Sequence, residues 1–276
     1  MENDKSKTNI PISAQMVREL RDVTGAGMMD CKKALVACNG DINSACDFLR
    51  IKSGVKAEGV SSRTASEGRL VFSHVDSVGV LAEINCETDF VARGDDFAEF
   101  CMNWAKAVAT DKNCDTSMNG DNGEQARKSL VMKVGENVNF GRTQILDASG
   151  NIEFYIHTGN KIGAMVDYHG DDEKTVRDIC MHIAAMRPEY LRMEDVPEDK
   201  LQKQREIFIA QSAELGKDPI MAEKIAEGKL KKHFAERVLE TQLYAKDNSI
   251  TVDNVLNNAG IRINALHWMV IGGVNI

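Results

Sequence analysis

Apolar residues recur at helical spacing near the start of the chain. Ser13 is a good N-cap for a first helix over residues 13–22, and residues 24–27 break it, since glycine adopts the positive φ of a helix exit. A second helix is predicted over residues 28–38, and Asp41 caps a third. Three short helices predict a small bundle with a thin core, as docking modules have.

A change of period then predicts strands. Residues 54–69 are rich in Lys, Gly, Ser and Glu, which predicts a linker that is helical at most in part. Residues 70–74 and 78–84 are expected to pair as a hairpin. After them, residues 96–109 return to helical spacing, with these side chains facing inward: Phe97, Phe100, Cys101, Trp104 and Val108. A polar loop (111–122), a helix (123–134) and a strand (137–145) are predicted next.

The same order of strand, turn, strand, charged turn and helix recurs further along. Its strands are predicted at residues 154–157 and 162–168, and its helix over residues 173–186. We therefore expect two related α+β halves, each a small antiparallel sheet covered by helices.

Two strongly charged helical segments follow, at residues 197–216 and 220–240, and a Lys-Asp-Pro break joins them. Helices linked this tightly form an antiparallel hairpin, and its polarity suggests that it projects from the core. The pattern fits a solvated arm as well as a docking arm. A short helix (251–258) and a strand (261–271) are expected to return to the second sheet.

The predicted fold class is thus α+β, with an N-terminal three-helix bundle, a two-part core of antiparallel sheets with helices, and a protruding antiparallel helical hairpin. Six segments follow from this: the docking module (1–53), the linker (54–69), the two core halves (70–149 and 150–196), the hairpin arm (197–245) and the C-terminal helix and strand (246–276).

Composition narrows the range of partners. The 276 residues carry a net charge of −8, which argues against nucleic acid or an anionic membrane as the main partner. The seven cysteines include no CxxC pair, so zinc is not expected, and Cys31, Cys38 and Cys46 have the spacing of small core residues in a reducing compartment. The first nine residues lack the apolar stretch of a signal peptide, so a cytoplasmic protein is predicted.

Two places along the chain present apolar side chains where a partner could meet them. Phe90 stands beside Asp89 in the charged turn at residues 85–94, and an exposed ring costs free energy unless something covers it. Either the ring folds under its own helix or a partner receives it. Met28 and Met29 lie about 100° apart on a helix, so at least one is expected near the surface.

Signatures of bond-making chemistry are absent. There is no HExxH, no GxSxG and no P-loop, and no strand precedes the Gly25–Gly27 pair. No catalytic residue, metal ligand or cofactor is therefore predicted. The residues alone leave open an adaptor that docks through the bundle and arm, and an enzyme that depends on a thiol or a nucleotide.

Several long motifs resemble those of the translation elongation factor Ts family, in the same order along the chain. They are residues 20–35 (LRDVTGAGMMDCKKAL), residues 85–92 (NCETDFVA), His157 with residues 161–163 (KIG), and residues 182–185 (HIAA) with residues 188–191 (PEYL).

The resemblance implies a guanine-nucleotide exchange factor for elongation factor Tu, without bond-making chemistry, direct nucleic-acid binding or a membrane. It implies that the N-terminal module is similar to a ubiquitin-associated bundle and docks on the GTPase. The partner-binding positions it implies are Leu20, Met28, Met29, His157, Lys161, Ile162 and Gly163. The segment implied to dislodge Mg²⁺ from the GTPase consists of Thr88, Asp89, Phe90 and Val91.

The mechanism expected from this resemblance is a wedge. Phe90 would insert between side chains of the GTPase, and Asp89 would fix the wedge by hydrogen bonds at its rim. Two places depart from the family's pattern: Arg93-Gly94 replace a lysine and a small polar residue, and Lys161 stands where arginine is usual. Lysine lacks the two-pronged donor geometry of arginine.

Overall fold

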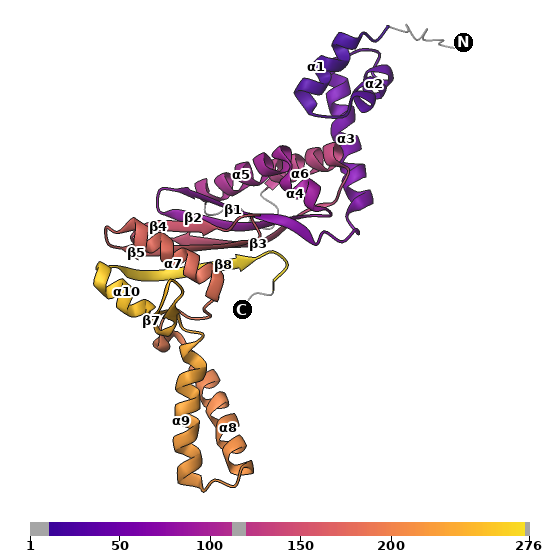
Figure 1. Ribbon diagram of the computed structural model, residues 1–276. Helices are drawn as coiled ribbons and strands as arrows, with labels where there is room; N and C mark the ends of the chain where they lie inside the picture. Colours follow the sequence, from indigo (N-terminus) through magenta and orange to yellow (C-terminus); the bar gives the residue numbers. More distant parts are fainter. Residues whose placement is uncertain (1–10, 112–119, 274–276) are drawn as a thin grey trace. The chain divides into compact units, whose positions relative to one another are not determined.

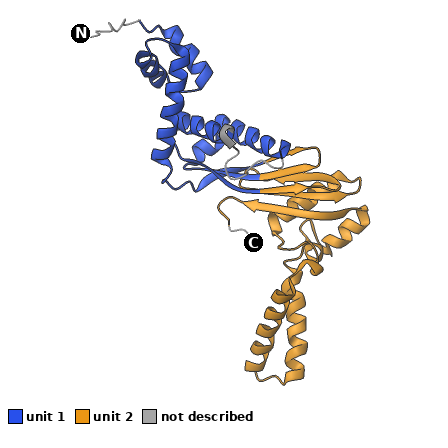
Figure 2. Cartoon of the chain, turned by 180° about the vertical axis from the view of Figure 1, so that it is seen from behind, with its two compact units in different colours: residues 1–71, 82–143 blue, residues 72–81, 144–276 orange. Residues whose placement is uncertain are grey.

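The computed structural model describes residues 11–111 and 120–273. The chain forms two compact units, residues 1–71 with 82–143 and residues 72–81 with 144–276 (Figure 2). Most of the predicted loose N-terminus and of the polar loop at 111–122 lies outside the described residues. The six predicted segment boundaries stay a prediction.

Three helices open the first unit, as the sequence predicts (Figure 1). They are α1 (Ala14–Thr24), α2 (Met28–Ala37) and α3 (Ile42–Val60). The Ser13 side chain accepts the Met16 N–H at the start of α1, and Gly25 ends that helix at φ 66°. The buried cluster between the helices includes Val17, Leu20, Leu35 and Leu49.

Helix α3 is longer than the sequence predicts, because its last turns are packed. Ala57 and Val60 are buried, and Lys56 Nζ donates to the Met132 carbonyl at 2.9 Å. Residues 54–60 of the predicted linker are therefore helical, and residues 61–66 connect α3 to the first strand.

The first sheet has the strand order β1 (Glu67–Val75), β2 (Val78–Cys86), β3 (Val138–Asp147). Helices α4 (Asp89–Arg93), α5 (Asp95–Thr110) and α6 (Gly120–Val134) lie between β2 and β3 in the chain. The inward positions predicted for α5 are confirmed, since Phe97, Cys101, Trp104 and Val108 are buried and Phe100 stacks on Phe140.

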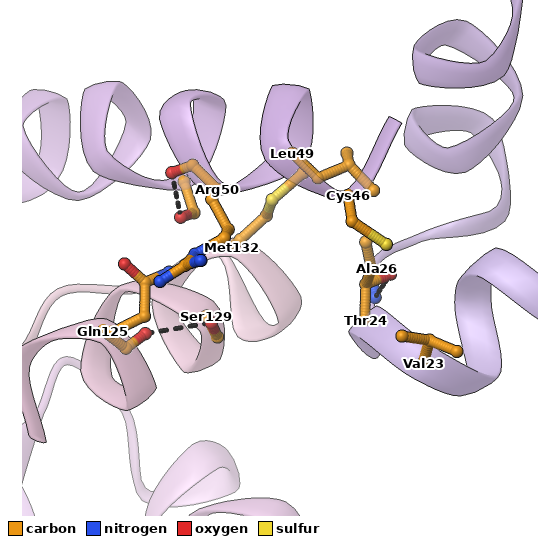
Figure 3. Close-up of a pocket in the computed structure, with 10 residues that line it drawn as sticks. Val23, Thr24, Ala26, Cys46, Leu49, Arg50, Gln125, Ser129 and Met132 are labelled. Atoms are coloured by element: carbon orange, nitrogen blue, oxygen red, sulfur yellow. Dashed lines mark hydrogen bonds between the residues drawn. The ribbon is translucent and has the colours of Figure 1, made fainter. Parts of the chain in front are cut away.

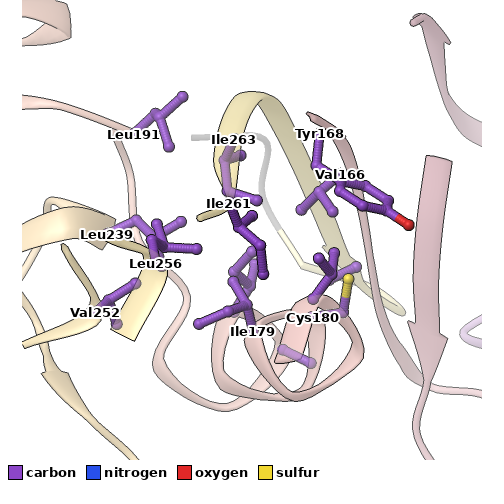
Figure 4. Packing of buried hydrophobic residues seen from close by; sticks show 14 of the residues in the cluster. Val166, Tyr168, Ile179, Cys180, Leu191, Leu239, Val252, Leu256, Ile261 and Ile263 are labelled. Carbon is purple, nitrogen blue, oxygen red and sulfur yellow. The ribbon is translucent and has the colours of Figure 1, made fainter. Parts of the chain in front are cut away.

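The second sheet is antiparallel, in the order β4 (Asn151–Ile156), β5 (Ile162–His169), β8 (Arg262–Val270). The prediction that the C-terminal strand returns to this sheet is confirmed by the pairing of Ala164 with Trp268. Helices α7 (Glu173–Met186) and α10 (Val252–Ala259) pack with it around the core shown in Figure 4, where Val166, Ile179 and Ile263 meet.

The charged segments form the predicted pair of helices, α8 (Glu198–Glu214) and α9 (Pro219–Ala235), which run side by side (Figure 1). At the base of the pair, Leu230 and Phe234 join Val238 in a small buried cluster. Sequence reasoning missed the hairpin of β6 (Leu243–Tyr244) and β7 (Asp247–Thr251), since β6 is too short to show a period. Two short 3-10 turns, Met193–Asp195 and Leu239–Thr241, complete the second unit.

A buried histidine ties α7 to the segment after α9. Nδ1 of His182 accepts the Ala245 N–H at 3.1 Å, so Nε2 carries the proton and donates to Gln242 Oε1 at 2.8 Å. The Gln242 amide in turn donates to the Glu236 carbonyl. Burial lowers the pKa of His182 below its usual 6.5, and the hydrogen bond to Gln242 opposes that shift.

We predict that replacing His182 lowers stability in a pH-dependent way. The unfolded chain binds a proton on this histidine below about pH 6.5 and the folded chain binds it only at lower pH, so its stabilising contribution falls as the pH drops below 6.5. His182→Ala should lower the free energy of unfolding by about 2–3 kcal/mol at pH 7.5, because the buried Gln242 side chain and the Ala245 N–H lose their partner. The deficit should be smaller at pH 5.5.

Urea unfolding followed by circular dichroism at both pH values measures this. His169→Gln, at an exposed histidine of the same unit, is the matched control. A deficit of equal size at the two pH values would show that the proton on His182 does not matter to folding.

Candidate functional site

Phe90 points into solvent. Its side chain is 84% exposed, so the alternative in which the ring folds under its own helix is wrong for this structure. Phe90 lies in α4, where Ala92 takes the buried side, and residues two apart on a helix face roughly opposite directions. The segment after β2 therefore presents an apolar ring outward.

Asp89 and Arg93 flank the ring and pair with each other. The Arg93 guanidinium lies 3.0 Å from Asp89 Oδ2, and the Arg93 side chain is largely exposed while that of Asp89 is partly exposed. A surface pair of this kind contributes about 0–1 kcal/mol, so a partner can separate it at little cost. Gly94 follows as the N-cap of α5, and a Cβ there would lie 3.3 Å from the Val91 carbonyl oxygen.

Glu136 holds the turn that carries the ring. Its carboxylate accepts the Thr88 hydroxyl at 2.6 Å, the Thr88 N–H at 3.0 Å and the Glu87 N–H at 3.2 Å. Thr88 then caps α4, because its hydroxyl oxygen accepts the Val91 N–H at 3.4 Å. Thr88 and Val91 are thus half-buried supports of the segment, and Phe90 is its exposed tip.

Sequence reasoning missed Glu136. The signal available was a polar pair, Glu136-Asn137, between a glycine that ends α6 at φ 78° and an apolar strand. The spacing of residues along the sequence does not indicate that this pair contacts the turn after β2. The two meet only because β3 pairs beside β2 in the folded sheet.

The contact between the two turns is reciprocal. Glu87 Oε1 accepts the Asn137 N–H at 2.6 Å. The Asn137 amide then donates to the carbonyls of Ser61 and Arg63, at 3.2 and 2.8 Å. Hydrogen bonds between side chains and backbone thus join three segments that are far apart in the sequence: the end of α3, the turn after β2 and the turn before β3.

Cys86 lies beside this turn, and its thiol is unreactive. Burial, with the Glu136 charge as a second cause, raises the pKa of its thiol to about 12. Burial likewise raises the pKa of Cys101 and Cys180. Since the thiolate is the nucleophile, these three positions do not support the thiol-enzyme alternative.

The glycine pair that could suggest a nucleotide site serves two helix ends. Gly25 is the C-cap of α1 and Gly27 is the N-cap of α2, so a helix and not a strand precedes them. The two glycines therefore serve as helix caps and do not form a phosphate-binding loop.

The bundle exposes two of its three predicted contact residues. Met28 and Met29, in the first turn of α2, are 47% and 64% exposed, which confirms that at least one lies at the surface. Leu20 is fully buried, because it lies one turn after Val17 on the core face of α1. Its side chain is part of the bundle's core in this structure, and the partner contact implied for Leu20 stays a prediction.

A cavity of about 260 Å³ lies beside the bundle, between the end of α1, α3 and α6 (Figure 3). Leu49, Arg50, Gln125, Ser129 and Met132 are among its lining residues. Met132 also belongs to the buried cluster of the bundle, so α6 reaches that core directly. Met28 and Met29 do not line this cavity.

In the second unit, His157 and Ile162 line one depression of about 260 Å³, with Tyr155, Met181, Ala184 and Ala185. The Tyr155 hydroxyl lies 2.7 Å from His157 Nδ1, and the His157 N–H donates to the Ile162 carbonyl across the turn. Lys161 is exposed beside them, whereas Gly163 is buried and pairs with Ile156 and Met269. Gly163 can act there only through its backbone.

Within residues 11–111 and 120–273, no group of three His, Cys, Asp or Glu side chains is arranged to hold a metal ion. No helix in the same ranges has the length and apolarity needed to cross a membrane.

Comparisons with known proteins point to one family. Residues 87–273 match the family model described as Elongation factor TS. The chain is 43% identical to elongation factor Ts of Nitrosomonas eutropha over 270 residues, which covers 95% of this chain and 92% of the relative. It is 41% identical to the same factor of Nitrosospira multiformis (95% and 90%) and 42% identical to that of Thioalkalivibrio sulfidiphilus (91% and 89%).

Proposed function

Since this chain belongs to the elongation factor Ts family, and so is a nucleotide exchange factor for elongation factor Tu, we propose that Phe90 is the wedge with which it releases GDP. The observation that carries this proposal is the exposed ring on a turn that hydrogen bonds hold on its inner side. As a translation factor of bacterial type, the protein acts in the cytoplasm.

Exchange makes and breaks no covalent bond, so the factor needs no acid, base or cofactor of its own. GTPases hold GDP largely through phosphate contacts and Mg²⁺, and Mg²⁺ demands near-ideal octahedral geometry. A side chain that displaces the element carrying the magnesium ligands therefore weakens GDP binding. By linkage, GDP must weaken binding of the factor by the same ratio.

The wedge segment has the properties this task needs. The Phe90 ring has little packing to lose in the free factor, so most of its apolar surface is available to the partner. Asp89 can exchange its Arg93 contact for donors at the rim of the partner's pocket. Thr88 and Val91 act through the cap that holds α4.

Two further surfaces are proposed to dock the GTPase. Met28 and Met29 form the first, because methionine is a soft and adaptable contact residue. His157, Lys161 and Ile162 form the second, in the other unit. The likeness of the bundle to a ubiquitin-associated module stays part of the proposal. The adaptor alternative lacks exchange, so it is set aside by family membership.

We predict that Phe90→Ala slows GDP release from elongation factor Tu at saturating factor by at least about tenfold, since about 1.4 kcal/mol of differential binding corresponds to a factor of ten. Release of a fluorescent GDP measures this. The fold should be unchanged within about 0.5 kcal/mol, because the ring is exposed.

Val55→Ala is the matched control for Phe90→Ala, since it also removes an exposed apolar side chain from a helix of the first unit. It should release GDP as the wild type does. Wild-type release by the Phe90→Ala variant would contradict the wedge.

We predict a different signature for the methionines. Met28→Ala with Met29→Ala should raise the factor concentration at half-maximal exchange about five- to twentyfold, as loss of two contact side chains does, and leave the release rate at saturation near wild type. The same exchange assay at varied factor concentration measures both values. A lowered rate at saturation with an unchanged half-maximal concentration would contradict a docking role.

A further inference from the structure

We propose that Glu136 is a positioning residue for exchange: its carboxylate sets the direction in which Phe90 is presented. This inference rests on the proposed role of Phe90 as the wedge. It adds a residue outside the wedge segment and outside the two docking surfaces.

The need for such a residue follows from the size of α4. A helix of five residues is not stable alone, because nucleation costs more than one turn of hydrogen bonds returns. The exposed Phe90 ring gains no orientation from packing in its own unit. The direction of the ring is therefore set by the burial of Ala92 on the inner side of α4 and by the backbone just before α4, at Glu87 and Thr88.

Glu136 forms hydrogen bonds with that stretch of backbone. Its two oxygens accept the N–H groups of Glu87 and Thr88 and the Thr88 hydroxyl, at 2.6–3.2 Å. Hydrogen bonds to an ionised acceptor are about twice as strong as neutral ones, and three of them on one half-buried carboxylate leave the turn little freedom. The hydroxyl bond also orients the Thr88 oxygen toward the Val91 N–H.

The side chain of the neighbouring residue, Asn137, has different partners. The Asn137 side chain donates to Ser61 and Arg63, at the end of α3, and so holds the fold without its side chain touching the turn before α4. The two adjacent side chains thus separate a structural role from a positioning role.

The same stretch of chain connects Glu136 to the docking bundle. Met132 is part of the bundle's buried cluster, and Lys133 pairs with Asp96 at the start of α5 at 2.6 Å. Residues 132–136 therefore contact the bundle, α5 and the wedge turn in succession. A GTPase held by the bundle meets a ring whose direction is set by the end of α6.

The test is a double-mutant cycle on stimulated GDP release from elongation factor Tu, with Glu136→Ala, Phe90→Ala and the double variant. We expect Glu136→Ala to slow release at saturation by about tenfold, because misplacement by about 1 Å at a reacting site costs up to 10²-fold. The half-maximal factor concentration should change less than twofold. In the Phe90→Ala background, Glu136→Ala should have no further effect on the rate.

Two variants separate positioning from folding. Glu136→Gln keeps an acceptor for both N–H groups and a donor for the Thr88 hydroxyl oxygen, so it should restore release to within about threefold of wild type. Asn137→Ala removes a comparable number of buried bonds and should lower the melting temperature as much as Glu136→Ala does, with release at saturation near wild type.

The outcomes distinguish the two proposals. If Phe90→Ala alone leaves GDP release unchanged, the wedge proposal is wrong, and the positioning role of Glu136 is wrong with it. If Phe90→Ala slows release while Glu136→Ala does not, or while the two effects multiply in the double variant, the wedge stands and the positioning role is overturned. A loss in Asn137→Ala equal to that in Glu136→Ala would also overturn it.

Discussion

One carboxylate accepts three hydrogen bonds from the turn that carries an exposed phenylalanine. An exposed benzyl ring forgoes about 2–3 kcal/mol of burial, and in an unconstrained loop it would collapse onto the nearest apolar surface. The buried Ala92 and the hydrogen bonds from Glu87 and Thr88 to Glu136 hold the segment with the ring outward. The sheet and helices beneath serve to bring residue 136 to residue 88.

The constraint gives a physical account of exchange without chemistry. In the proposed mechanism Phe90, Met28 and Met29 act only by contact, so the free energy that opens the GTPase must come from binding. A rigid wedge delivers that energy to the partner, whereas a mobile one would lose part of it in ordering itself. The Asp89–Arg93 pair, which lies in water and is weakly held, is the part of the segment left free to rearrange.

Apart from β6 and β7, the order of helices and strands could be predicted from hydrophobic periodicity, because most of these elements carry an apolar stripe. The exposure of Phe90 could be posed only as a question, since it depends on Ala92 taking the inward side of α4. The family motif marks Leu20 as important without saying whether it faces a partner or the core, and in the structure it is buried. Glu136 was missed because its bonds form only after β3 has paired beside β2.

The most direct measurement of the central claim is GDP release by wild type and Phe90→Ala, compared with and without a chelator that removes Mg²⁺. If the ring acts by disturbing the magnesium site, removing Mg²⁺ with a chelator makes the ring unnecessary. The GDP release rates with wild type and with Phe90→Ala should then differ by less than about twofold. An undiminished difference in the absence of Mg²⁺ would contradict the account, because the ring would then act on GDP by another route.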